Sequence, residues 1–296
     1  MLRLLPLAVL LCTLAACAPR DSATQTAPGG AVATMATLAS LTRAVVSPHM
    51  TVRSLVPVGA SVESYQPRPR DVAEVHGARL LVENGAGLEA WLQETLQGAR
   101  NPNLHVVICS DGMAIEQENP HLWMDPLYAK VYVQKIAAGA ALADPAHARD
   151  YAAAAERYGR QLDDLDRWIR ARIATIPPQQ RTMIVYHNAW YYYAKRYGIH
   201  LVGVIEPNPG QEPSAYQLAR LVDLARRYHV RAVFASPQFS PKLARELARS
   251  AGITTVRNLY DSSAGERPEV ADYLSMMRYD TNVIVDALTA LSVERT

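Results

Sequence analysis

Short runs of β-branched and apolar residues alternate along this chain with amphipathic stretches. The apolar runs predict eight β-strands, at Ala31–Met35, Thr51–Val56, Arg79–Glu83, Leu104–Cys109, Met183–Tyr186, His200–Ile205, Arg231–Ala235 and Thr254–Leu259. The stretches between them have helical spacing, at Leu38–Val46, Arg70–Gly77, Leu88–Ala99, Ala189–Tyr197, Ala215–Tyr228 and Pro241–Ala251. This alternation predicts an α/β fold with two lobes, each built on a mostly parallel sheet flanked by helices.

A much longer helical pattern separates the two groups of strands. It starts at Asp144-Pro145, a pair that suits a helix start, and stops at Pro177-Pro178. Its apolar residues recur every three or four positions, at Tyr151, Ala155, Tyr158, Leu162, Leu165, Ile169, Ile173 and Ile176. At ~1.5 Å per residue such a helix extends roughly 45 Å, more than one small lobe. We therefore predict an N-terminal lobe at 31–143, a linking helix at 144–176 and a C-terminal lobe at 177–296.

The N-terminal residues indicate export. Arg3 precedes an apolar run from Leu4 to Ala16, which is shorter than the ~20 residues of a membrane-spanning helix and suits a signal peptide. The segment Leu14–Cys17 resembles a bacterial lipobox, although an ordinary signal peptide with a chance cysteine is the alternative. We predict a signal peptide at 1–16, lipidation of Cys17 and a flexible tether over 17–30. The protein would then be exported and held by lipid to the cell membrane, on its periplasmic or extracellular face.

Composition narrows the choice of partners. Of 296 residues, 49% are hydrophobic and 20% are charged, which is an ordinary globular mixture. The 30 Lys and Arg residues nearly balance the 28 Asp and Glu residues, which argues against a nucleic-acid partner. Once residues 1–16 are removed and Cys17 is acylated, the only remaining cysteine is Cys109, inside an apolar run. We expect a buried thiol there and no disulfide.

Three predicted loops place a histidine or a carboxylate directly after a strand. Glu63 lies in the loop Val56–Pro67, His121 in the segment Asn119–Pro126, and His187 at the end of the strand that reaches Tyr186. Ligands of parallel sheets bind at the carboxyl ends of the strands, so these positions carry most of the functional information. Taken singly, each residue also fits an ordinary structural role.

Several segments taken together resemble one known family. They are the turn Val82–Glu89, the segment Asn119–Pro126, the segment His187–Gly198, the triplet Glu212–Ser214 and the segment Leu259–Ser262. In this order they resemble the metal-binding subunits of bacterial ABC importers for manganese, zinc and iron, the cluster A-I (cluster 9) solute-binding lipoproteins. The resemblance extends from Ala31 to the C-terminus.

The resemblance implies four metal ligands in the cleft between the two lobes. By position His121, His187 and Asp261 match ligands of the family. The first position departs from it, since Glu63 stands where the family has a histidine. Either Glu63 coordinates the metal or the site has lost a ligand, and we expect coordination. Glu206, in a loop after a strand, is a rival carboxylate that we expect behind the ligands.

Two carboxylates and two neutral imidazoles would balance the charge of a divalent cation. In the family such sets are usual for manganese and iron, whereas three histidines are usual for zinc. The stretch Ser110–Glu118 also lacks the histidines that many zinc importers carry there. We therefore favour Mn²⁺ or Fe²⁺ as the transported ion. Zn²⁺ remains the alternative, because the motif around His187 is zinc-like and most such sites bind Zn²⁺ more tightly than Mn²⁺.

The predicted function is that of a monomeric, membrane-anchored substrate-binding subunit. It would capture the ion outside the cytoplasmic membrane and deliver it to an ABC permease that works with a cytoplasmic ATPase. Two other classes stay open. A zinc hydrolase is disfavoured because the chain lacks H-E-x-x-H and a filled set of four ligands leaves no open position, so we expect no enzyme. A surface adhesin, a label that some family members bear, is not distinguished by these residues.

Overall fold

The computed structural model describes residues 29–207, 210–265 and 267–290. The predicted signal peptide, Cys17 and nearly all of the predicted tether lie outside these residues. None of the described helices is both long enough and apolar enough to cross a membrane. Cys109 is free and buried, as the apolar run around it predicted.

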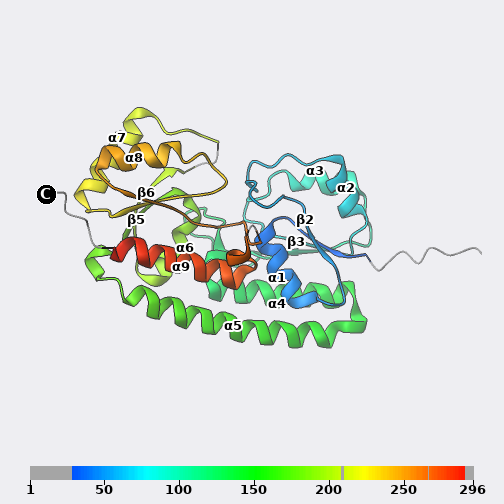
Figure 1. The fold of residues 1–296 in the computed structure, drawn as a ribbon. Helices are drawn as coiled ribbons and strands as arrows, with labels where there is room; N and C mark the ends of the chain where they lie inside the picture. Colours follow the sequence, from blue (N-terminus) through cyan, green and yellow to red (C-terminus); the bar gives the residue numbers. More distant parts are fainter. Residues whose placement is uncertain (1–28, 208–209, 266, 291–296) are drawn as a thin grey trace, which may run out of the picture.

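Two four-stranded sheets, one in each lobe, form the framework (Figure 1). The first has the order β2-β1-β3-β4, with β1 (Ala31–Ala33), β2 (Val52–Ser54), β3 (Leu80–Glu83) and β4 (His105–Ile108). The second has the order β6-β5-β7-β8, with β5 (Thr182–His187), β6 (His200–Glu206), β7 (Ala232–Ala235) and β8 (Thr255–Asn258). Every pairing is parallel, which confirms the predicted fold class.

Successive side chains of the central strands enter different cores because they point to opposite faces of a sheet. In β5, Met183 and Val185 join a large core that contains residues of both lobes, whereas Ile184 and Tyr186 join a smaller core under α7 and α8. In β3, the same alternation sends Leu81 to a third core under α2 and α3. Both faces of each sheet are therefore covered, which explains why these strands read as continuous apolar runs.

Helices flank both sheets. The outer faces are covered by α2 (Pro69–His76) and α3 (Leu92–Ala99) in the first lobe, and by α7 (Ala215–Arg227) and α8 (Lys242–Ala251) in the second. The large shared core is enclosed by α1 (Ala36–Val46), α4 (Pro126–Ala143), α5 (Ala148–Ala174), α6 (Tyr191–Tyr197) and α9 (Tyr273–Thr289). Helix α3 starts four residues later than predicted, because Glu89 folds back to bond the Gly85 turn.

The long helix α5 runs beneath both lobes (Figure 1). It is shorter than the predicted range 144–176, because residues 145–147 form a 3₁₀ turn that follows Asp144 and the last helical residue is Ala174. Most of its apolar stripe, including Leu162, Leu165 and Ile169, is fully buried in the shared core, and Tyr158 packs against that core partly buried. Helix α5 therefore contributes to the packing of both lobes as well as connecting them.

Helix α9 was not predicted. Its buried face includes Asp280 and Thr281, two polar residues that interrupt the apolar period. The helix returns towards the first lobe, where the backbone N–H of Tyr273 donates to Ser40 of α1 at 2.9 Å. The last of the described helices thus packs against both lobes.

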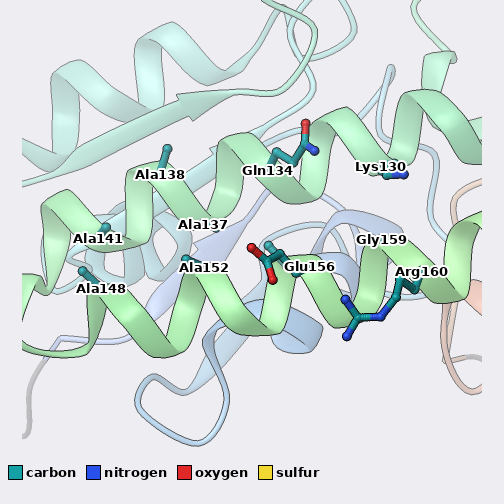
Figure 2. Close-up of a pocket in the computed structure, with 11 residues that line it drawn as sticks. Lys130, Gln134, Ala137, Ala138, Ala141, Ala148, Ala152, Glu156, Gly159 and Arg160 are labelled. Atoms are coloured by element: carbon teal, nitrogen blue, oxygen red, sulfur yellow. The ribbon is translucent and has the colours of Figure 1, made fainter.

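Helices α4 and α5 lie side by side and leave a shallow groove between them (Figure 2). The floor and rims of the groove are mostly alanine, including Ala138, Ala141, Ala148 and Ala152. Such small side chains let the two helix backbones approach closely. The groove contains none of the histidines or carboxylates that the sequence singled out.

Candidate metal centre

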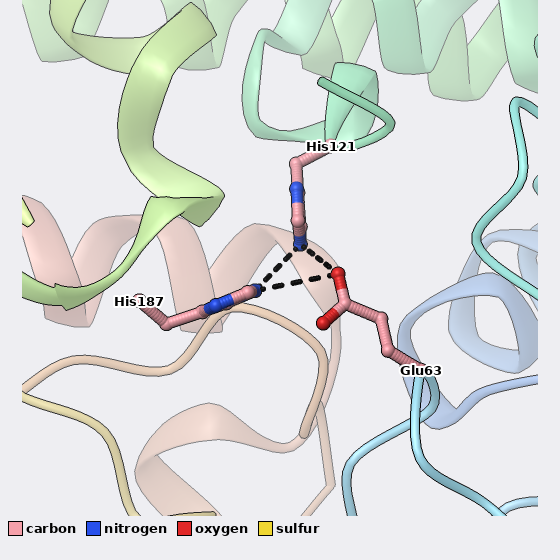
Figure 3. Close-up of side chains that lie close together, drawn as sticks. All are labelled: Glu63, His121 and His187. Carbon is pink, nitrogen blue, oxygen red and sulfur yellow. Dashed lines mark hydrogen bonds and ion pairs between the residues drawn. The ribbon is translucent and has the colours of Figure 1, made fainter. Parts of the chain in front are cut away.

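Glu63, His121 and His187 come together between the lobes (Figure 3). The two Nε2 atoms of the histidines are 2.9 Å apart, and Glu63 Oε1 lies 3.4 Å from that of His121 and 3.5 Å from that of His187. Neighbouring ligand atoms of an ion with bonds of ~2.0–2.2 Å are roughly 3.0–3.5 Å apart. The three side chains thus present two nitrogens and one oxygen at the spacing that a single metal ion requires.

The loop that carries Glu63 is held by buried residues on either side. The indole of Trp91 donates to the carbonyl of Val62 at 2.8 Å. On the other side, the hydroxyl of Tyr65 donates to Asp71 at 2.7 Å, and its ring packs edge-on against Trp91. Glu63 is therefore fixed at its backbone, while its side chain is 19% exposed at the edge of the site.

The orientation of His121 is set by Asn119. The Asn119 Oδ1 atom accepts from the backbone N–H of His121 at 3.0 Å, and its Nδ2 donates to the carbonyl of Asn188 at 2.7 Å. These two bonds define which amide atom is the oxygen. The same Oδ1 lies 3.0 Å from His121 Nδ1, so Nδ1 carries the proton and donates to it. Nε2 of His121 consequently directs its lone pair into the site, where it faces Nε2 of His187.

The turn Val82–Glu89 supports the segment that carries His121. Asn84 accepts from the hydroxyl of Tyr132 at 2.6 Å and donates to the carbonyl of Pro120, the residue before His121, at 2.9 Å. Glu89 in turn accepts from the backbone N–H groups of Asn84 and Gly85. This turn therefore has a structural role that its sequence alone did not reveal.

His187 is the last residue of β5 and only 5% exposed. Its register partner on β6 is Glu206, whose carboxylate accepts from the Tyr186 hydroxyl at 2.9 Å and from the backbone N–H of Gly210. Glu206 thus lies on the neighbouring strand, opposite His187, and is not one of the three clustered residues. The ring of Phe239 packs near that of His187. Within the described part of the chain, Nδ1 of His187 has no hydrogen-bond partner.

Asp261 follows β8 and is 2% exposed. It does not belong to the three-residue cluster, in which all ligand atoms lie within 4.8 Å of one another. Its Oδ1 accepts from Gln238 at 2.8 Å and from Ser262 at 3.0 Å. Its Oδ2 is buried and has no partner among the described residues. A buried carboxylate oxygen without a donor is costly unless a cation or proton approaches it.

The electrostatics of the cluster reflect its burial. Burial lowers the pKa of His121, and the charge of His187 lowers it further. Burial also lowers the pKa of His187. The hydrogen bond and the charge of Glu63, with smaller effects of Asp261 and Glu206, outweigh burial, so the pKa of His187 is raised overall. Burial raises the pKa of Asp261. The site thus holds acidic groups in a poorly solvated environment where a cation would be stabilised.

Sequence reasoning did not single out Asn119 or Gln238. Asn119 belongs to a quoted motif, but only the structure shows that its amide determines the tautomer of His121. Gln238 lies after β7, at the same carboxyl edge of the sheet as the predicted residues, and this position was the available signal.

Together these features define a two-lobed solute-binding protein with a site for a metal ion. Residues 31–287 match the family described as "Zinc-uptake complex component A periplasmic", and the chain belongs to that family.

Two curated relatives align over most of the chain. The manganese-binding lipoprotein MntA of Halalkalibacterium halodurans is 30% identical over 243 residues, which cover 80% of this chain and 81% of the relative. The iron-binding protein YfeA of Yersinia pestis is 31% identical over 245 residues, which cover 80% and 78%.

Solved structures agree with the fold. A crystal structure of ZnuA superposes with a TM-score of 0.80 at 28% identity and covers 88% of this chain and 99% of that one. The Mn-bound periplasmic metal-binding protein of Candidatus Liberibacter asiaticus superposes with a TM-score of 0.78 at 21% identity, over 88% and 99% of the two chains. At that identity the second likeness concerns the fold alone.

Proposed function

We propose that this protein is the substrate-binding subunit of an ABC importer, with Glu63, His121, His187 and Asp261 as ligands of a transported divalent metal ion. The observation that carries the proposal is the convergence of two imidazole nitrogens and one carboxylate oxygen within 3.5 Å. The unpaired Oδ2 of Asp261 supports a fourth ligand, brought to the ion by a small shift of its loop. Glu206 is proposed to support His187 from the neighbouring strand without touching the ion.

The favoured ions are Mn²⁺ and Fe²⁺. Glu63 and Asp261 would supply hard oxygen donors, and a carboxylate can bind through both oxygens and raise the coordination number above the four that zinc prefers. The relatives named for manganese and iron support this assignment. Zn²⁺ is the alternative, supported by the two imidazoles and by the likeness to ZnuA.

The ion would be delivered to a membrane permease coupled to a cytoplasmic ATPase. Relatives named as lipoproteins of metal ABC transporters support an exported protein that is anchored through a lipid on Cys17. We propose that it acts as a monomer, with an N-terminal lobe at 31–143, a linking segment at 144–176 that contains helix α5, and a C-terminal lobe at 177–296. We also propose that it catalyses no reaction, because four protein ligands would leave no open position for an activated water.

The test is a competition titration of the metal-free protein lacking residues 1–17. Mn²⁺, Fe²⁺ under anaerobic conditions and Zn²⁺ would each compete with a chromophoric chelator. The proposal expects one ion per chain, with the site lost in the double variant His121→Ala, His187→Ala. Absence of stoichiometric binding of all three ions would contradict it. Tetrahedral coordination together with exclusive loading of zinc, after growth with all three metals, would exclude the manganese and iron assignment.

A further inference from the structure

Alternate residues of the segment 119–125, here named the crossing segment, contact the second lobe. Their contacts include one side-chain contact from each residue: Asn119 Nδ2 to Asn188 O at 2.7 Å, His121 Nε2 to His187 Nε2 at 2.9 Å, Trp123 Nε1 to Asp261 O at 2.6 Å, and Asp125 Oδ1 to Arg196 Nε at 3.2 Å. Only the second of these is a contact between proposed metal ligands. The other three join the lobes immediately around the site.

The last contact belongs to a buried ion triad. The guanidinium of Arg196, on α6, meets Asp125 from the crossing segment and Asp166 from the long helix α5, whose Oδ1 lies 2.7 Å from Arg196 Nε. The three side chains are only 9–15% exposed. The hydroxyl of Tyr197 also donates to Asp166 at 3.0 Å. One arginine thus connects the first lobe, the second lobe and the helix that links them.

The triad is linked to both imidazoles along the chain. Asp125 lies four residues after His121 and caps α4, since its Oδ1 accepts from the backbone N–H of Leu127 at 2.8 Å. Arg196 lies on α6, which starts shortly after His187. A planar guanidinium holds two carboxylates in a defined geometry, whereas a lysine ammonium would not. Removing the arginine would leave Asp125 without this cation beside Asp166, which keeps only the half-exposed Arg170 at 3.3 Å, so the two carboxylates would repel.

We propose that Arg196 is a positioning residue for the metal site. With Asp125 and Asp166 it sets the separation of the His121 and His187 imidazoles, and so the affinity for the ion. The inference rests on the proposed function. It assigns a role to two residues of the sequence motifs, Asp125 and Arg196, that do not themselves bind metal.

A double-mutant cycle tests it, with Zn²⁺ and a chromophoric chelator as the probe. Arg196→Met is expected to lower the affinity for Zn²⁺ by about tenfold or more, the loss typical of residues that orient metal ligands. In the His121→Ala background the same change is expected to cost less than about twofold, because the histidine that Arg196 positions is gone. Asp125→Asn is a second variant, which keeps an oxygen to cap α4 and removes the charge that pairs with Arg196.

Arg172→Met is the matched control. Arg172 joins α5 to α9 through Asn282 at 3.1 Å and does not contact the crossing segment. It is expected to change the affinity by less than about twofold in both backgrounds. Equal losses for Arg196→Met with and without His121, or no loss in either Arg196→Met or Asp125→Asn, would overturn the positioning role. Failure of the unaltered protein to bind Zn²⁺ would instead contradict the proposed function.

Discussion

His121 and His187 lie 66 positions apart in the chain, yet their Nε2 atoms face each other at 2.9 Å. Because Asn119 holds the proton of His121 on Nδ1, the single hydrogen between the facing nitrogens belongs to His187 in the metal-free protein. A metal ion must displace that hydrogen, after which both lone pairs point at the ion. In a neutral ring the hydrogen moves to Nδ1 of His187, which has no partner among the described residues, whereas a doubly protonated ring must release one proton to solvent. Because Glu63 raises the pKa of His187, metal binding is expected to weaken as the pH falls.

Glu63→Ala is expected to weaken metal binding by about tenfold or more, because it removes one of three converging donors. Competition titration would measure the change. Glu63→His is expected to shift the preference towards zinc, since it replaces a hard oxygen by an imidazole. Glu94→Ala, an exposed acid on α3, is the control. An unaltered affinity in Glu63→Ala would show that the ion binds without this carboxylate.

Asp261→Asn is expected to act in opposite directions on the metal-free and metal-bound protein. Burial raises the pKa of Asp261, so its charge destabilises the metal-free fold at neutral pH, and the amide removes that cost. The ion, by contrast, loses an anionic donor. Thermal unfolding without metal should therefore shift upwards, while the affinity falls by about tenfold or more. A fall in both quantities would show that Asp261 is needed for packing rather than for the ion.

Metal removal is expected to lower the melting temperature. An ion at about 100 times its dissociation constant stabilises the fold by ~2.7 kcal/mol. For a chain of this size that corresponds to roughly 5–10 °C. Calorimetry with and without a chelator would measure it. The double variant His121→Ala, His187→Ala should show no such shift, and an equal shift there would point to ions bound elsewhere.

Glu83→Gln is expected to stabilise the protein at neutral and alkaline pH and to have little effect at acidic pH. Burial, and secondarily the charge of Glu89, raise the pKa of Glu83 from 4.5 to about 7. The folded state therefore holds this proton more tightly than the unfolded state, and stability falls as pH rises from about 4.5 to about 7. The variant lacks this loss.

Denaturant unfolding at several pH values would measure the effect. The difference between Glu83→Gln and the unaltered protein should be near zero at pH ~4.5 and reach about 1–3 kcal/mol above pH ~7.5. Glu94→Gln, on an exposed position, provides the comparison. A difference that did not vary with pH would contradict the raised pKa.

Much of the fold could be predicted because both sheets are covered on both faces. Strands such as β5 and β7 are then continuously apolar and stand out from the helices around them. Helix α9 could not be predicted because Asp280, whose Oδ1 accepts from the backbone N–H of Tyr260, lies on its buried face. One oxygen of that carboxylate is bonded by a segment 20 positions away, which no local pattern can show, and the other has no partner among the described residues.

The candidate site was predicted from residue types at strand ends together with the family resemblance. His121, His187 and Glu63 do converge, whereas Asp261 lies nearby and outside the cluster. The residues that hold these side chains in place could not be predicted. Asn119, Asn84 and Gln238 are uncharged amides, and amides of this kind are common in loops. Their roles depend on contacts across the fold, so their identity alone could not distinguish them.

The spacing of contacts along the crossing segment limits which substitutions, insertions and deletions this protein can tolerate there. Its polar contacts with the second lobe fall on every other residue, and Leu122 and Met124 between them are fully buried in the shared core. An insertion or deletion of one residue inside 119–125 would exchange the contacting and non-contacting positions beyond it. This segment should therefore tolerate apolar replacements of similar size at Leu122 and Met124 far better than any change of length.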